Sequence, residues 1–270
     1  ILYASHPLTT QPVSYISNRS SLMATFFSLM TFYFFLRFFN LPINAEKAKK
    51  AFLIFFMAVM FFLACASKAI AAALPLAMVA FLFFLFSQAP RKILRNSLWV
   101  VFPLIFYLGY RTFTLGSAFN LPMDSGSHKL NSLNYLLTQF NAVTFNYGMK
   151  VLLPTSLNFE PGIKLVQGFL DPGWIVPALI LIILFFLVWQ HPSRVARFGI
   201  IWAMLTLLPA SSIIPLKQLA SEHRTYLPFI GISWLIGGCF AGNLWLKRNT
   251  VILFSLYMTG LILLSANRTL

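Results

Sequence analysis

The chain alternates between long apolar runs and short polar connections. Eight of the runs come close to the roughly 20 residues that an α-helix needs to cross a bilayer core about 30 Å thick. They are residues 20–36, 51–66, 69–86, 98–115, 174–189, 198–214, 226–246 and 251–265. This pattern predicts an all-α fold: a polytopic transmembrane helix bundle of about eight spans.

The longest connection between spans, residues 116–173, has two parts. The first part is rich in Pro, Gly and small polar residues, which is typical of a loop. Residues 135–153 are different, because apolar side chains recur at three- and four-residue steps, at Leu136, Phe140, Val143, Tyr147 and Val151. The spacing predicts an amphipathic helix, ended by Pro154, that lies at the membrane surface or packs over the bundle.

The basic residues indicate which way the bundle faces. Eleven of the 20 Lys and Arg residues fall in connections that lie on one side of the predicted bundle, together with only one acid, Glu46. They are Arg37, Lys47, Lys49, Lys50, Arg91, Lys92, Arg95, Arg194, Arg197, Lys247 and Arg248. The positive-inside rule makes that side cytoplasmic. The other acids, and both ends of the chain, are then external; these acids are Asp124, Glu160, Asp171 and Glu222.

Composition agrees with a membrane protein and disfavours other classes. Apolar residues make up 59% of the chain and charged residues only 9%, whereas a soluble domain carries about 25% charged residues. The net charge of +15 does not predict a nucleic-acid partner, because the basic residues punctuate apolar runs and line no single face. Cys65 and Cys239 lie deep in apolar runs, where we expect them to pack as small hydrophobes. The chain starts at Ile1 inside a predicted loop, so we interpret it as a piece of a longer protein.

Three external positions carry polar groups that are suited to binding. His6, Gln11 and Arg19 lie in the polar segment before the first span. It is either a plain interfacial loop with a snorkelling Arg or the rim of a ligand site. Lys68, at the tip between the second and third spans, either marks a turn at the interface or holds a phosphate as a point charge.

The third position is the run Glu222-His223-Arg224, followed by Tyr226, between the sixth and seventh spans. Arg224 can bind an anion with its planar guanidinium, and Glu222 can orient it by pairing. The alternative is an interfacial salt bridge worth about 0–1 kcal/mol. The remaining acids and His6, His128, His191 and His223 are scattered, so we expect no zinc site. No Gly-rich phosphate loop, nucleophile elbow or Cys-His arrangement is present in the sequence.

Four segments resemble, in the same order, those of a known family: HPLTTQPVSYISNRSSLMATFF, ASKAIAAALPL, YLLTQFNAVTFNYGMKVLLPTSLNFE and SSIIPLKQLASEHRTYLPFIGISW. The family is that of the membrane-embedded glycosyltransferases of the GT-C type that carry tetratricopeptide repeats. It includes the transmembrane-and-TPR O-mannosyltransferases of animals and many bacterial relatives. The four matches cover most of the chain, which would then be a single, partial GT-C-like domain over residues 1–270.

The resemblance implies an enzyme that transfers a sugar from a polyprenyl-phosphate-linked donor to a protein Ser or Thr hydroxyl on the outer face of the membrane. A glycan acceptor and a divalent cation are also compatible with it. By position, Lys68 and Arg224 would hold the donor phosphate. His6, Gln11 and Arg19 would line the donor pocket, and Glu222, His223 and Tyr226 would complete and orient it. The closer likeness to bacterial versions implies an inner membrane with a periplasmic site.

Two departures from the family pattern matter. Ala69 stands where the family often has Glu after the Lys, so Lys68 lacks that partner. The span and loop that carry the family's catalytic acid would precede Ile1, and the repeats would follow Leu270, so we expect this fragment alone to be inactive. The main alternative function is a polytopic transporter or a flippase for lipid-linked substrates, but such proteins place polar groups near the bilayer midplane. A scaffold for a soluble repeat domain is a third possibility.

Overall fold

The computed structural model describes residues 1–42, 44–86, 103–110, 112–113, 131–154, 157, 162–211, 215–216, 218–240 and 248–269. Within these ranges the regular structure is helical and no strand occurs, which confirms the predicted all-α class. Arg91, Lys92, Arg95, Asp124, His128, Glu160 and Lys247, and much of the predicted fourth span, lie outside the described residues. The chain divides into two compact units, which are residues Ile1–Arg19 with Met123–Leu270, and residues Ser20–Pro122. We call them the first and the second unit.

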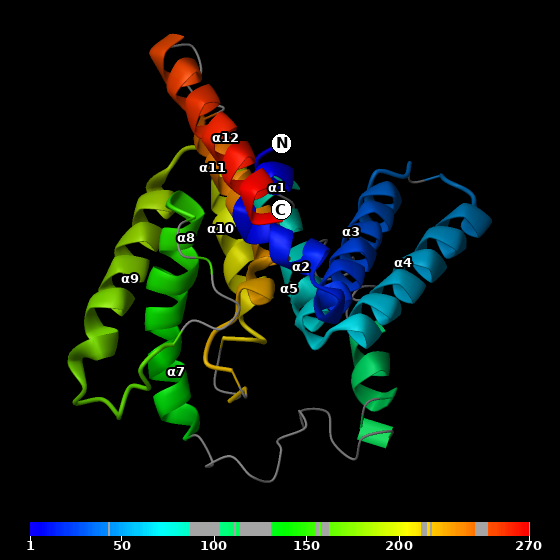
Figure 1. The fold of residues 1–270 in the computed structure, drawn as a ribbon. Helices are drawn as coiled ribbons and strands as arrows, with labels where there is room; N and C mark the ends of the chain where they lie inside the picture. Colours follow the sequence, from blue (N-terminus) through cyan, green and yellow to red (C-terminus); the bar gives the residue numbers. More distant parts are fainter. Residues whose placement is uncertain are drawn as a thin grey trace. The chain divides into compact units, whose positions relative to one another are not determined.

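The described part of the second unit consists of helices (Figure 1). Its elements are α3 (Arg19–Phe39, whose first residue belongs to the first unit), α4 (Lys47–Ser67), η3 (Ala69–Ala73), α5 (Leu74–Phe86) and a helical stretch over residues 103–110. Lys68 is extended, with φ −161° and ψ 133°, and so separates α4 from η3. Helix α3 buries a row of small hydroxyl residues, Ser21, Thr25, Ser28 and Thr31. Aromatic edges complete the packing; the rings of Phe32 and Phe81, for example, lie 4.9 Å apart.

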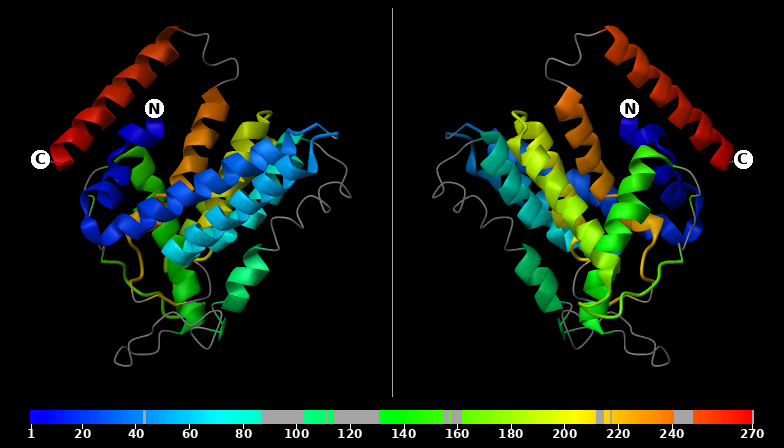
Figure 2. Two further views of the ribbon diagram at one scale, coloured as in Figure 1. Left: turned by 90° about the vertical axis from the view of Figure 1, so that its right-hand side faces the viewer. Right: turned by 90° about the vertical axis from the view of Figure 1, so that its left-hand side faces the viewer.

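The first unit is assembled from both ends of the chain and its second half. Its elements are α1 (Leu2–Ser5), η1 (Pro7–Thr9), α2 (Thr10–Ser14), η2 (Ile16–Asn18), α7 (Ser132–Asn141), η4 (Ala142–Gly148), α8 (Met149–Leu152), η5 (Pro172–Trp174), α9 (Ile175–Gln190), α10 (Arg194–Leu207), η6 (Glu222–Thr225), α11 (Pro228–Phe240) and α12 (Arg248–Thr269). Helix α12 packs on α1, η1 and α2, so the last helix lies against the first residues (Figure 2).

Helices α10 and α11 pack at the distance of backbone contact. A Cβ atom on Gly231 would lie 2.4 Å from the carbonyl oxygen of Gly199, and one on Gly199 would lie 2.5 Å from the carbonyl oxygen of Gly231. Gly238 makes the same kind of approach to Ala196, with its Cβ at 2.6 Å from the backbone nitrogen. Small residues at such crossings let helices meet without side chains between them, as in many membrane proteins. Trp202 closes the pair by donating its indole N–H to the carbonyl of Leu227 at 3.2 Å.

One helix runs from Ser132 to Leu152 through α7, η4 and α8, and its middle segment η4 is a π-helix. The buried side of this helix includes its polar residues, among them Gln139, Thr144 and Lys150, together with Tyr135 and Tyr147. By contrast Phe145, Met149 and Leu152 are exposed. Polar groups toward the protein and apolar groups outward are the reverse of a soluble helix and suit an apolar surrounding.

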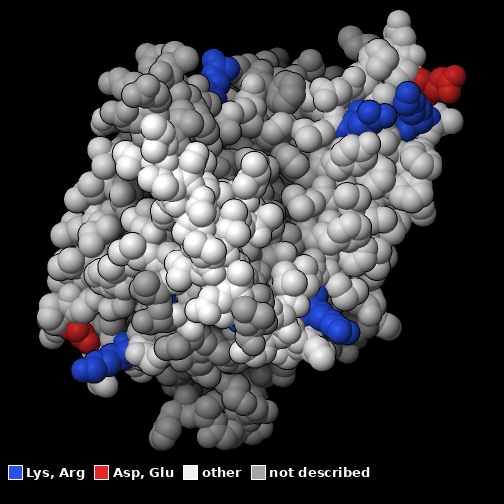
Figure 3. Space-filling model, turned by 45° about the horizontal axis from the view of Figure 1, so that its top comes forward, with Lys and Arg blue, Asp and Glu red and all other residues white. Residues whose placement is uncertain are grey.

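Three helices are long and apolar enough to cross a membrane: Ile16–Phe39, Lys47–Ser67 and Pro172–Gln190. The segments Ala69–Leu85, Pro228–Phe240 and Ile252–Arg268 are apolar but shorter. Much of α9 is exposed, including Leu179, Ile183 and Leu187, and charged side chains are few on the surface in Figure 3. The chain thus has the spanning helices and the surface of a membrane protein.

Candidate functional site

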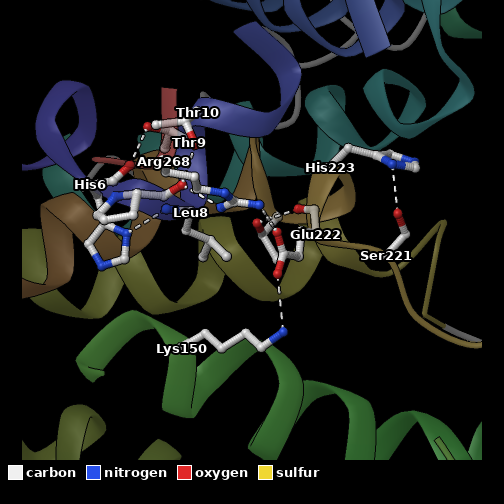
Figure 4. A network of polar contacts seen from close by, with 11 residues as sticks. His6, Leu8, Thr9, Thr10, Lys150, Ser221, Glu222, His223 and Arg268 are labelled. Carbon is white, nitrogen blue, oxygen red and sulfur yellow. Dashed lines mark hydrogen bonds and ion pairs between the residues drawn. The ribbon is translucent and has the colours of Figure 1, made fainter. Parts of the chain in front are cut away.

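A buried carboxylate between two cations forms the centre of the candidate site, in the first unit (Figure 4). Glu222 begins the short helix η6 and is 1% exposed. Its Oε1 accepts from Lys150 Nζ at 3.1 Å, and its Oε2 accepts from the Arg268 guanidinium at 2.7 Å. These three residues lie on α8, η6 and α12, so the ion pairs join segments that are distant in the sequence. Charge-assisted hydrogen bonds of this kind are among the stronger polar contacts in proteins.

The helix that ends in α8 determines where Lys150 points. The π-helical turn before it contains more residues per turn than an α-helix, and such turns are frequent at functional sites. Tyr147, in that turn, accepts from the backbone N–H of Ser221 at 3.1 Å with its hydroxyl. Earlier in the same helix, Gln139 donates its amide to the carbonyl of Leu219 at 2.9 Å. The chain that leads into Glu222 is therefore fixed along the polar side of this helix.

The N-terminal segment lines another side of the site and contributes His6. The backbone N–H of Leu8 donates to His6 Nδ1 at 3.1 Å, so that nitrogen carries no hydrogen. Nε2 then holds the hydrogen and donates to the carbonyl of Val151 at 3.0 Å, which makes the ring neutral. Burial lowers the pKa of His6, although the bond to the Val151 carbonyl acts in the opposite direction. The imidazole thus ties η1 to the end of α8 in one tautomer.

Arg268 joins this N-terminal segment to the carboxylate. It donates through NH1 to the carbonyl of Pro7 at 2.8 Å while NH2 bonds Glu222. The carbonyl of Val151 accepts not only from His6 but also from the hydroxyl of Tyr257 on α12, at 3.0 Å. Helix α12 therefore contacts both the N-terminal segment and the end of α8.

Arg224 is buried two residues after Glu222, but its partners are neutral. Its NH2 donates to the carbonyl of Gln218 at 2.7 Å, and its NH1 donates to the hydroxyl of Tyr135 at 3.3 Å. A longer contact of 3.5 Å reaches the carbonyl of Ala210. The expected pairing of Glu222 with Arg224 is replaced by pairing of Glu222 with Lys150 and Arg268, because these two cations approach the carboxylate from α8 and α12.

The other predicted residues of this unit surround the same turn. His223 is half-buried, with Nδ1 2.7 Å from the hydroxyl of Ser221. Tyr226 is buried beside Tyr3, whose hydroxyl donates to the carbonyl of Tyr226 at 3.2 Å. Gln11 is 1% exposed, and neither its amide nitrogen nor its amide oxygen has a hydrogen-bond partner among the described residues. The segment around His6 and Gln11 and the segment 222–226 are thus brought together.

Lys68 belongs to the second unit. Its ammonium donates to the hydroxyl of Ser21 at 2.6 Å, at the beginning of α3, so the tip after α4 and the start of α3 lie at one end of that unit. Arg19, the first residue of α3, is exposed.

Two residues of the site, Lys150 and Arg268, were not among the sequence-based candidates. Lys150 is a single cation on an amphipathic helix, which sequence patterns assign to the solvated face. Arg268 follows the last apolar run, and a basic residue at the end of a membrane span is common without any binding role. Predicting both ends of the chain to be external was the one signal that could have brought Arg268 together with the first residues.

The cluster is suited to binding an anion. Lys150, Arg224 and Arg268 are three cations of low exposure, and Glu222 is the acid that the described residues place among them. A buried cation without a counter-charge is costly, so such a site favours an added negative group. A metal is less well provided for, because no three His, Cys, Asp or Glu side chains gather anywhere in the described ranges.

Comparison with known proteins adds no relative: no protein-family model matches the chain, and neither a curated protein nor a solved structure is significantly similar to it.

Proposed function

We propose that this chain is the donor-binding part of a GT-C-type glycosyltransferase. It would cross a bacterial inner membrane about eight times and face the periplasm with its site. The full-length enzyme would transfer a sugar from a polyprenyl-phosphate-linked donor to a Ser or Thr hydroxyl of a protein. This function rests on the order of the four family-like segments, and the structure adds one independent support.

That support is the excess of buried positive charge in the first unit. Among the described residues of the site, Glu222 compensates only part of the charge of Lys150, Arg224 and Arg268. The phosphate of a lipid-linked donor carries the missing negative charge, and it gains more charge as the glycosyl bond breaks. Cations held in a water-poor site stabilise such a leaving group more strongly than they would in water.

In the first unit, Arg224 would contact the donor phosphate, with Lys150 and Arg268 adding to the positive potential. Glu222 would hold Lys150 and Arg268 in place, and the neutral His6 would fix the N-terminal segment. In the second unit, Lys68 is the residue to which the family resemblance gives a phosphate contact. Gln11, whose buried amide lacks a described partner, would bind a sugar hydroxyl.

Transfer of labelled sugar by the full-length protein to a Ser/Thr peptide tests this function. The variants are Lys68→Met and Arg224→Lys, with Lys164→Met as a matched control, because Lys164 is an exposed cation of the first unit outside the cluster. Loss of one charge-assisted contact to phosphate, about 1.5–3 kcal/mol, should weaken donor use about tenfold or more. Wild-type transfer by both variants would refute the phosphate assignment, and no transfer by the wild-type protein would refute the activity.

A neutral ligand separates charge recognition from lipid binding. Polyprenyl phosphate should bind the protein much more tightly than the corresponding polyprenol, and the difference should shrink in Lys68→Met. Equal binding of the two lipids would favour a site that recognises only the chain, as a lipid-binding scaffold would.

A further inference from the structure

A tight turn just before α9 exposes two large apolar side chains. Residues 168–171 form this turn, closed by the backbone N–H of Asp171, which donates to the carbonyl of Gly168 at 3.2 Å. Phe169 and Leu170 occupy its two central positions and are 60% and 99% exposed. Such positions are normally taken by Gly, Pro, Asn, Asp or Ser, so an apolar pair there needs an explanation.

Side-chain and backbone contacts hold this turn in its shape. The carboxylate of Asp171 accepts from the backbone N–H groups of Gln167 at 3.1 Å and Gly173 at 2.9 Å, and these bonds lower its pKa. Trp174 donates its indole N–H to the carbonyl of Phe169 at 3.3 Å. Gly168 has φ +103°, a conformation that L side chains rarely adopt. The chain is thus built to keep the two apolar side chains outward.

The turn is also anchored to the rest of the first unit. The backbone N–H of Val166 donates to the hydroxyl of Thr138 at 3.0 Å, and Val166 is buried. The rings of Trp174 and Phe140 lie 6.1 Å apart. The 168–171 turn therefore has a fixed position relative to α7 and α9.

The apolar helix that follows the 168–171 turn indicates what surrounds Phe169 and Leu170. The segment Pro172–Gln190 is 19 residues long and among the three that can cross a membrane. At 1.5 Å per residue it spans about 28 Å, close to the thickness of the bilayer core. Its first turn, with Trp174, then lies at one boundary of that core, where Trp is favoured. Leu170 lies two residues before this segment, so the exposed pair lies at the same boundary.

We infer that the 168–171 turn is a lipid-interface anchor, with Phe169 and Leu170 inserted into the headgroup–acyl boundary of the bilayer. Asp171 remains among the polar headgroups, where its hydrogen bonds inside the turn reduce the cost of being near lipid. Lys164 is exposed on the preceding segment, and we expect its ammonium on the aqueous side of that boundary. The anchor does not depend on the proposed enzymatic activity.

A fluorescent label on Leu170→Cys, in the full-length protein in phospholipid vesicles, tests this position. Bromine atoms near the headgroup end of the acyl chains should quench the label strongly, and aqueous iodide should quench it weakly, as expected about 5–10 Å into the interface. The matched control is a label on Lys164→Cys, which should show the opposite preference. Equal iodide quenching at both sites, with no quenching by brominated lipid at position 170, would overturn the anchor.

A second variant tests the role of the turn's shape. Asp171→Ala removes the acceptor that holds the turn, so quenching of the position-170 label by shallow bromine should fall. Circular dichroism of the same samples verifies that the helices are kept. Unchanged quenching in this variant would show that position 170 enters the interface without the turn, against the inference that the turn presents it.

Discussion

The two units bury polar groups in different ways. The second unit buries hydroxyl groups on one helix; Thr31, for example, donates to the carbonyl of Phe27 in its own helix at 2.7 Å. The first unit buries charged residues whose partners lie far away in the sequence, such as Glu222 with Lys150 and Arg268. A hydroxyl satisfied within its own helix needs no other element. A buried carboxylate between two helices is stable only when the whole unit is assembled.

This difference indicates where chemistry can reside. The bond of Thr31 stays inside α3 and joins no other element. The charged residues of the first unit require several segments to meet, and they leave positive charge that a ligand can use. We therefore expect substitutions of charged residues to lower the folding stability of the first unit much more than that of the second.

Removing the central carboxylate should have the largest effect. Glu222→Ala leaves Lys150 and Arg268 with little exposure and without their counter-charge, at a cost of about 3–5 kcal/mol. Thermal unfolding of the detergent-solubilised protein measures it. Glu46→Ala is the control, because Glu46 is an exposed acid of the second unit, and a change within about 0.5 kcal/mol is expected. Similar losses in the two variants would remove the contrast between the units.

A smaller loss is expected where α10 and α11 touch. Gly231→Ala places a Cβ 2.4 Å from the carbonyl oxygen of Gly199, so the helices must separate, at about 1–3 kcal/mol. Gly237→Ala on the same helix meets nothing within 4 Å, and it should be neutral or stabilise the helix by up to about 1 kcal/mol. Chemical unfolding of both variants provides the measurement. An equal response would mean that close packing is not what joins this helix pair.

The smallest effect concerns pH. His6 is neutral when folded and its pKa is lowered by burial, so the unfolded chain binds a proton more readily. The stability that His6 contributes is present above its unfolded pKa of about 6.5 and is lost as pH falls toward the folded pKa. The slope cannot exceed about 1.4 kcal/mol per pH unit for one proton. The free energy of unfolding of the wild type should fall between about pH 7.5 and about pH 5.5, and His6→Asn should reduce that fall. The second unit contains no His. If the pH dependence of stability were the same in His6→Asn as in the wild type, it would come from other residues of the first unit.

The sequence predicted helices well because apolar runs and their boundaries are local signals. The predicted segment 174–189 corresponds to η5 and α9, and the predicted segment 51–66 lies within α4. Extended Lys68 separates two helices, as its place between two apolar runs indicated. Three helices have the length and hydropathy to cross a membrane, whereas α10 ends at Leu207, earlier than the apolar run alone indicated.

The site was predicted only in part, because its contacts are long-range. Glu222 and His6 were identified from clusters of polar residues at the ends of apolar runs, and the structure places them near each other. The sequence suggested Arg224 as a partner of Glu222, whereas the structure pairs Glu222 with Lys150 and Arg268. Lys150 and Arg268 could not be chosen from spacing, since a contact across 72 or 46 residues depends on how helices pack.

The π-helical segment Ala142–Gly148 has a consequence for any attempt to build or redesign this region. An α-helix advances by about 100° per residue around its axis, so a wide turn changes the direction of every side chain that follows it. If all the residues of this segment were kept but the helix were made regular, the ammonium of Lys150 would swing away from Glu222 by about that angle. The turn thus works as a rotational offset, and threading these residues onto an ideal helix would aim the lysine at the wrong neighbour.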